Sequence, residues 1–462
     1  MIRMILPLML LAAPALGGTP EDPRGLIPPP RAACGEVPAT ALSLAALVDI
    51  ALCRNPQTAA GWAAARAAAA QAGAARGAAL PSIDASFGPT LTRSNSFQGT
   101  GFVDGNGQIV GGAQAVTNTN TSARLALSYL IFDGGGRSAR IAAADAQAAA
   151  ALAQYADTAQ AVVLNVVTAY NALAGNRAVE EANRANVAFA RQSRDLAAAR
   201  SRAGVATGAD RLQAETQLAQ AELTLIQTRG SVATSAAQLA VAVGLPPTMA
   251  LDLAPAAPLG DAARLKAGAA ALIAEAERLR PDILAARANV SAAEANVRSA
   301  RSAGRPSLAV QASNSLSAVD TNVDRNLASV GVILSVPIFS GWNARYNIAA
   351  ARAQLEQQQA LAEQTRQQAG LAVYSNVIAF ENALASLETA RVLVASATES
   401  AALAQGRYKA GVGTFAELLN AQAAQAGARQ QLVQAEFNLR TADAQLARAV
   451  GDMGEAIPER RR

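Results

Sequence analysis

The chain has 462 residues, of which 51% are hydrophobic but only 4% are aromatic, and it contains no histidine. Because much of the hydrophobic content is alanine, the composition favours long, closely packed helices over one large core of bulky side chains. The missing histidine excludes Ser–His pairs, Cys–His pairs and histidine-ligated metal sites, and the net charge of +5 comes from scattered arginines, so we expect no enzyme, no cofactor, no metal and no nucleic-acid partner.

The N-terminus has the pattern of a secretory signal peptide over residues 1–17. Arg3 precedes an apolar run from Ile5 to Leu11, and small residues follow it. The alternative, a membrane anchor, is disfavoured because the run is too short to span a bilayer. The mature chain is therefore expected beyond the inner membrane, beginning with an N-terminal periplasmic segment over residues 18–53.

Two cysteines, Cys34 and Cys53, follow the signal peptide and lie 19 residues apart. In an oxidising compartment we expect them to form a disulfide. In the simple entropy treatment, closing such a loop contributes about 3 kcal/mol. A catalytic role is the weaker interpretation, because no histidine is available to activate a thiol.

The rest of the chain is a tandem duplication. Phe132 and Phe339 are 207 residues apart, and the later glycine turns keep that separation. Upstream, Pro81 and Pro306 are 225 residues apart, so the first copy holds 18 more residues between its proline and its phenylalanine. Self-similarity at a fixed period indicates that the same structural module occurs twice.

Each repeat has the same predicted parts in the same order. Repeat 1 covers residues 54–245, with a helix, a β-hairpin over 82–132 and a long helical hairpin over 137–244. Repeat 2 covers residues 281–451, with a helix, a β-hairpin over 307–339 and a long helical hairpin over 343–451. Residues 246–280 are expected to be an equatorial connector, and residues 452–462 a C-terminal tail.

The predicted strands alternate apolar and polar side chains, which is typical of strands with one exposed polar face. In the first strand, Ile83, Ala85 and Phe87 alternate with serine and aspartate. In the last, Val330, Val332 and Leu334 alternate with serine and glycine. The glycine-rich stretch over 98–114 is predicted to be a loop.

Proline is absent from residues 90–245 and 338–457. The segments 137–203 and 343–410 are therefore predicted to be helices on the order of 100 Å long at about 1.5 Å per residue. Each ends in a glycine turn, after which a second helix returns.

Glycines stand where each hairpin passes into its long helix: Gly134, Gly135 and Gly136 in "DGGGR", and Gly341 in "SGWNA". A phosphate-binding loop is disfavoured, because no Lys-Ser/Thr follows the glycines. The preferred interpretation is geometric: the chain turns from a tilted strand into a helix, and glycine permits the required dihedrals.

Four amphipathic strands after a signal peptide favour a transmembrane β-barrel. Four strands cannot close into a barrel, and an open edge in lipid leaves backbone groups unpaired. We therefore expect several chains to pool their strands. The alternative is a soluble coiled-coil protein that carries two hairpins.

Several motifs resemble the outer membrane efflux proteins related to TolC: "NP" before the first helix, "IFDGGGR", "PIFSGW" and "YKAGVGTFAELLNAQ". The resemblance covers residues 44–451. It implies an α+β membrane protein of the outer membrane with a large periplasmic part. The expected homotrimer forms a 12-stranded β-barrel and a 12-helix α-barrel.

The resemblance also implies a periplasmic gate at the tips of the helical hairpins. Asp210 and Tyr408 match a carboxylate–tyrosine lock of the family, and Glu417 matches one acid at the channel entrance. The arginine of that lock falls at Gly413, and a second entrance acid falls at Asn420, so both are missing. Basic residues nearby are alternative partners: Arg202, Arg407 and Lys409.

By resemblance, the function is a passive exit duct that works with a periplasmic adaptor and an inner-membrane pump or ABC transporter. Small drugs, metals and a secreted polypeptide all remain open as cargo. The alternative function is a structural or adaptor protein of the periplasm without a channel.

Overall fold

The structure is a computed structural model that describes residues 41–97, 102–103, 105–106, 109–110, 113–204, 207–254, 268–319 and 323–454. The expected signal peptide and Cys34 lie outside these residues, so the cleavage and the Cys34–Cys53 bond stay predictions. Among the described helices, none is long and apolar enough to cross a membrane.

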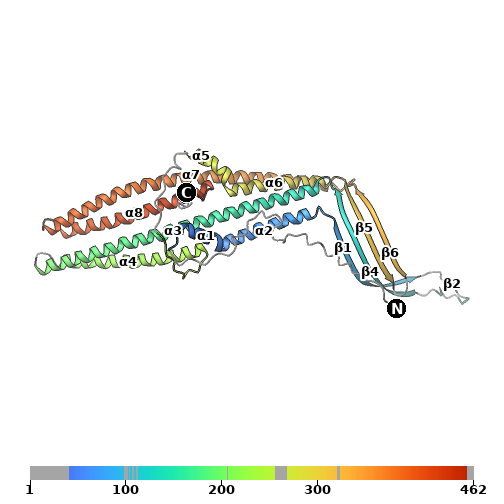
Figure 1. Cartoon of the computed structure of the whole chain (residues 1–462), viewed down its shortest axis with the longest axis horizontal. Helices are drawn as coiled ribbons and strands as arrows, with labels where there is room; N and C mark the ends of the chain where they lie inside the picture. Colours follow the sequence, from blue (N-terminus) through green and yellow to red (C-terminus); the bar gives the residue numbers. More distant parts are fainter. Residues whose placement is uncertain are drawn as a thin grey trace. The chain divides into compact units, whose positions relative to one another are not determined.

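The chain divides into two compact units. Unit 1 comprises Met1–Ala68, Ala148–Asn289 and Gln359–Arg462, and unit 2 comprises Ala69–Gln147 and Val290–Gln358. The strands belong to unit 2, and most of each long helix belongs to unit 1 (Figure 1).

Unit 2 contains a four-stranded antiparallel sheet in the order β1-β4-β5-β6. The strands are β1 (Ser82–Phe97), β4 (Ala113–Phe132), β5 (Ser307–Val319) and β6 (Val323–Ser335). The alternation in the sequence predicted which side chains share a face, and the register agrees. Phe87 pairs with Ala123, and Ala123 pairs with Leu316, so the apolar positions of neighbouring strands stand side by side.

The glycine-rich stretch over 98–114 differs from the loop that we expected. Within it, β2 (Phe102–Val103) and β3 (Ile109–Val110) form a two-stranded antiparallel ribbon. β1 and β4 pair as far as Phe97 with Ala113, so β4 begins within this stretch. Threonines alternate with asparagines along this part of β4, and β-branched threonine favours the extended backbone.

The turns from strand to helix need glycine for two separate reasons. Gly134, Gly135 and Gly341 have φ of 64°, 90° and 58°, in the left-handed region that L side chains disfavour. Gly136 has an ordinary φ, but a Cβ there would collide with Ser302 Oγ. The sequence did not indicate that Trp342, at φ 64°, would occupy the position equivalent to Gly135.

Eight helices complete the described fold: α1 (Leu44–Arg54), α2 (Pro56–Gly77), α3 (Gly136–Arg202), α4 (Gly208–Val243), α5 (Gly268–Leu279), α6 (Pro281–Ser302), α7 (Asn343–Lys409) and α8 (Phe415–Val450). The long helices α3 and α7 have 67 residues each, and their returning partners α4 and α8 have 36 each. Equal lengths in the two copies indicate that the duplication preserved both hairpins.

Two helices lie where the sequence analysis expected only a segment and a connector. α1 is in the segment 18–53, and α5 is in the connector 246–280. α1 packs Leu47, Val48 and Ala51 into a core shared with α3 and α4, and α5 packs Leu272 and Ala276 against α7 and α8. Their apolar residues recur at helical spacing, but burial against the long helices is what stabilises such short helices.

Candidate functional site at the helical hairpin tips

The two helical hairpins turn at tips that are equivalent under the 207-residue repeat. We call residues 200–210, described except for 205–206, tip 1 and residues 407–417 tip 2. In each tip a threonine caps the returning helix: Thr207 Oγ1 accepts from the Asp210 amide at 3.2 Å, and Thr414 Oγ1 accepts from the Glu417 amide at 3.2 Å. A side-chain oxygen at this position satisfies an otherwise free helix N–H.

The two predicted acids behave differently after that common cap. The Asp210 carboxylate accepts from the Thr207 amide at 3.0 Å, which completes a capping box. The Glu417 side chain is 51% exposed, and its Oε2 lies 4.0 Å from Arg407 Nη2. Asp210 thus stabilises its own helix, whereas Glu417 presents its charge to solvent.

Tip 2 is anchored by two aromatic side chains. Tyr408 and Phe415 are only 4% and 3% exposed, and their ring centroids lie 5.3 Å apart. They belong to a small core with residues from both repeats: Ala197, Ala214, Leu418 and Leu419. Repeat 1 therefore holds the tip of repeat 2 through apolar packing.

Arg200 of α3 adds a polar contact to that packing. Its guanidinium Nη1 donates to the Tyr408 carbonyl oxygen at 2.6 Å, and its Cζ lies 4.6 Å from the centre of the Tyr408 ring. An arginine over an aromatic face gains cation–π attraction in addition to the hydrogen bond. The sequence analysis named Arg202, Arg407 and Lys409 as alternative partners but missed Arg200. The available signal was that Arg200 is the repeat equivalent of Arg407.

The Tyr408 hydroxyl is buried and has no hydrogen-bond partner among the described residues. Burial raises the pKa of this phenol, the Arg200 charge opposes the shift, and the Asp210 charge adds to it. Within one chain, the Asp210 carboxylate bonds to Thr207 and the phenol keeps a free hydroxyl. The proposed Asp210–Tyr408 bond is therefore not one of the hydrogen bonds of the single chain.

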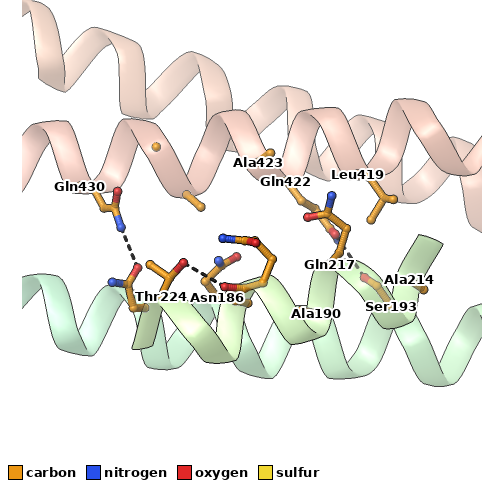
Figure 2. A pocket seen from close by; sticks show the side chains of 15 residues that line it. Asn186, Ala190, Ser193, Ala214, Gln217, Thr224, Leu419, Gln422, Ala423 and Gln430 are labelled. Carbon is orange, nitrogen blue, oxygen red and sulfur yellow. Dashed lines mark hydrogen bonds between the residues drawn. The ribbon is translucent and has the colours of Figure 1, made fainter. Parts of the chain in front are cut away.

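A cavity of about 270 Å³ lies between the α3–α4 hairpin and α8 (Figure 2). Its polar lining is made of uncharged side chains: Asn183, Asn186, Ser193, Gln217, Gln220, Thr224, Gln422 and Gln430. Gln430 Nε2 donates to Asn183 Oδ1 at 2.8 Å, and Ser193 Oγ donates to Gln422 Oε1 at 3.2 Å. These amides join the repeats through neutral hydrogen bonds.

The described residues contain no group of three or more His, Cys, Asp or Glu side chains positioned to hold a metal ion. The cavity lining also contains neither a charged group nor a thiol. Its chemistry suits helix–helix contact and recognition of polar groups.

Comparison with known proteins gives a consistent assignment. Residues 47–245 and 272–452 match the outer membrane efflux protein family. The chain is 32% identical over 420 residues to Protein CyaE of Bordetella pertussis, which covers 90% of this chain and 85% of that protein. It is 28% identical over 346 residues to outer membrane efflux protein BepC of Brucella suis, which covers 72% of this chain and 73% of BepC.

The fold also resembles that of a solved channel. The CmeC outer membrane channel of Campylobacter jejuni superposes with a TM-score of 0.75 at 17% identity, over 90% of this chain and 89% of that one. The solved structures that it resembles include outer membrane channels, and this protein is located in the outer membrane with a large periplasmic helical part. Together with the two matched repeats, these findings confirm the resemblance seen in the sequence: the chain belongs to the outer membrane efflux protein family.

Proposed function

We propose that three copies of this chain form a channel-tunnel that serves as a passive exit duct across the outer membrane. Each copy contributes four strands to a 12-stranded β-barrel and four long helical segments to a 12-helix α-barrel. The two repeats, residues 54–245 and 281–451, supply equivalent halves of each copy's share.

The observation that carries this proposal is the exposed apolar face of the sheet in unit 2. Ile83, Phe87 and Val330 are 67%, 77% and 81% exposed in the single chain, and all three stand on the same face. A face of this kind is unfavourable in water but is the surface that a transmembrane barrel turns to lipid. The opposite face carries Asp84, Arg124 and several serines, which suit a water-filled lumen.

The sheet also has two open edges. In the described part of the chain, β1 and β6 each pair with one neighbour only. Unpaired backbone groups at such edges are costly inside a membrane, so only closure into a barrel is stable there. Closure of the sheet with strands from further copies provides hydrogen-bond partners for the backbone groups of both edge strands.

The helical part of the protein suggests where its partner proteins bind. A periplasmic helical part that ends in two tips offers a docking end for a periplasmic adaptor and, through it, an inner-membrane pump or ABC transporter. A duct of this kind need not bind its cargo chemically, so drug efflux and type I protein secretion are both compatible with the site.

We further propose that tip 2 is the moving part of a periplasmic gate. Tyr408 and Asp210 are its contact residues, and Glu417 lines the entrance with negative charge. The buried phenol without a partner among the described residues supports this role, since an unsatisfied polar group is a source of strain that movement of the tip can release. Arg200 joins these residues because it holds the backbone of Tyr408.

Residues 1–17 are proposed to direct secretion, and Cys34 and Cys53 to pin the N-terminal segment beside α2, the first helix of repeat 1. The alternative function is a periplasmic coiled-coil protein without a channel. The exposed apolar sheet face argues against it, because a soluble protein rarely exposes a large contiguous apolar patch.

The test is to purify the protein in detergent, measure its mass and reconstitute it in a planar bilayer. We expect a mass of three chains and ion-conducting channels. A monodisperse monomer that keeps its strand content, or a trimer that never conducts, contradicts the proposal.

A further inference from the structure

Contacts between residues, as well as helices and strands, recur at equivalent positions of the two repeats. Asn55 Nδ2 donates to the Ala242 carbonyl at 2.9 Å, and the equivalent Arg280 Nη1 donates to the equivalent Ala449 carbonyl at 3.0 Å. Upstream residues follow the 225-residue offset and downstream residues the 207-residue offset. A contact in one half of the chain therefore specifies its equivalent in the other half.

The C-terminal glycines of the hairpins obey the same rule. A Cβ on Gly244 would lie 2.8 Å from the Arg54 oxygen. A Cβ on the equivalent Gly451 would lie 3.0 Å from the carbonyl carbon of Leu279, the equivalent of Arg54. The rule therefore holds for backbone packing as well as for hydrogen bonds.

Among the described residues, one contact in unit 2 lacks its repeat equivalent. The strand-to-helix turn of repeat 1 packs against the residues that follow α6. Arg305 Nη1 donates to the Gly134 carbonyl at 2.9 Å, and a Cβ on Gly134 would lie 2.6 Å from Arg305 Cβ. Under the two offsets, the equivalent contact would place Leu80, just after the end of α2, against Gly341. Yet a Cβ on Gly341 would have no heavy atom within 4 Å, and Leu80 is exposed.

We infer that this missing contact forms between copies: the turn at Gly341–Asn343 of one copy receives Gly77 and Leu80 of the neighbouring copy. The inference rests on the proposed trimer and adds its interface. The partner at this turn is a second copy of the chain, because a second copy provides another α2 end. The same second copy can also pair with the open edges at β1 and β6.

The sizes of the side chains support this assignment. In the intrachain contact the turn carries the small residue, Gly136, and α6 carries the larger one, Ser302, which leaves no room for a Cβ on the glycine. In the inferred contact the sizes are exchanged: the turn carries Asn343, and α2 carries Gly77. A Cβ on Gly77 has no neighbour within 4 Å in the single chain, so the space is open for the other copy.

The same rule gives the strand register between copies. Leu127 pairs with Ala312 within the chain, so Leu334 should pair with Phe87 of the neighbouring copy. Ala123 pairs with Leu316, so Val330 should pair with Leu91 of that copy. Both inferred pairs join side chains of the apolar sheet face, as a continuous lipid-facing surface requires.

Paired cysteines test the register. In a Cys34→Ser, Cys53→Ser background, Phe87→Cys or Leu91→Cys is combined with Val330→Cys or Leu334→Cys, and purified protein is oxidised with copper phenanthroline. Opposite residues on one face are close enough for a disulfide, whereas a four-residue displacement is about 13 Å.

We expect reducible crosslinked dimers and trimers from Phe87 with Leu334 and from Leu91 with Val330, and none from the two exchanged combinations. Trimers of native mass that crosslink only in the exchanged combinations, or in none, overturn the inference and leave the proposed function standing. A chain that is monomeric with its cysteines intact contradicts the proposed function itself.

A second test keeps the native cysteines. Gly77→Leu should fill the inferred space and lower the temperature at which the proposed trimer dissociates by about 5 °C, although leucine favours a helix more than glycine does. Asn343→Gly combined with Gly77→Leu should restore most of that loss, because residues in contact are coupled. If the changes in dissociation temperature caused by the two substitutions are additive, the inferred contact is wrong.

Discussion

Tip 1 and tip 2 begin their returning helices with the same threonine cap, yet among the described residues of the two tips only those of tip 2 include large buried side chains. The equivalents of Tyr408 and Phe415 in tip 1 are Ser201 and Gly208. The aromatic pair is buried in a core that includes repeat 1 residues, whereas Gly208 is exposed. The two copies thus share the turn, and their differences at these two positions give tip 2 an apolar interaction with repeat 1.

The charged residues of the tips diverge in a similar way. Arg200 and Arg407 are repeat equivalents, but Arg200 contacts the Tyr408 carbonyl and ring, and Arg407 makes a long ion pair at the surface. Asp210 and Glu417 are also equivalents, and only Asp210 closes a capping box. Equivalent positions thus offer matched controls for one another.

The largest expected effect comes from removing the anchor of tip 2. Phe415→Ala deletes a buried ring, which costs about 3 kcal/mol in comparable cores. Hydrogen exchange of residues 404–419 should accelerate, since the apolar contact with repeat 1 is lost. Gly208→Ala at the equivalent position of tip 1 is the control and should leave exchange unchanged. Equal effects of the two substitutions contradict the asymmetry.

The next largest effect concerns Arg200. Arg200→Met keeps much of the side-chain volume but removes the hydrogen bond and the cation–π contact, a loss of about 2 kcal/mol. In planar bilayers we expect higher spontaneous conductance. Arg407→Met is the matched control, since a surface ion pair contributes little. If Arg407→Met opens the channel and Arg200→Met does not, the contact at Arg200 is not part of the gate.

A third prediction tests the lock implied by the family. Asp210→Ala combined with Tyr408→Phe should loosen the closed state by about 1.5 kcal/mol and raise conductance. Asp210→Ala alone also removes the capping box, so Tyr408→Phe alone serves as the control because it removes the hydroxyl and leaves that box intact. A double variant that conducts like the wild type removes Asp210 and Tyr408 from the gate.

The Tyr408 phenol also predicts a pH dependence that separates the two tips. Because burial raises its pKa above the usual value of 10.0, the folded tip favours the neutral phenol. Its contribution is complete below that value and is lost as the pH rises through the raised pKa. Hydrogen exchange corrected for its intrinsic pH dependence should show tip 2 loosening at alkaline pH in the wild type, whereas Tyr408→Phe should not show it. An identical alkaline response in the variant contradicts the assignment.

The smallest effect is expected at Glu417. Glu417→Gln removes an exposed charge without breaking a cap or a buried contact, so the resting conductance should stay unchanged. The preference for cations, measured as a reversal potential in a salt gradient, should weaken, as should block by divalent ions. Unchanged selectivity means that Glu417 is a solvated helix residue away from the pore.

Much of the fold follows from the sequence alone, because its signals are periodic and local. The alternation of β1 and β6 identifies their apolar face, and the absence of proline over long stretches predicts α3 and α7. The 207-residue offset identifies the equivalent turns. Strand alternation and helix length depend on backbone geometry within one segment, which a repeating pattern of residues indicates directly.

Only the tertiary structure determined which helices and side chains are in contact. α1 and α5 are short, and burial against the long helices is needed to stabilise them. Arg200 looks like any other surface arginine of a long helix until folding brings Tyr408 beneath it. Asp210 and Glu417 share a helix position, and only side-chain length and neighbours separate a capping box from an exposed charge. The Arg200–Tyr408 contact joins residues 208 positions apart, where no local pattern carries information about distance.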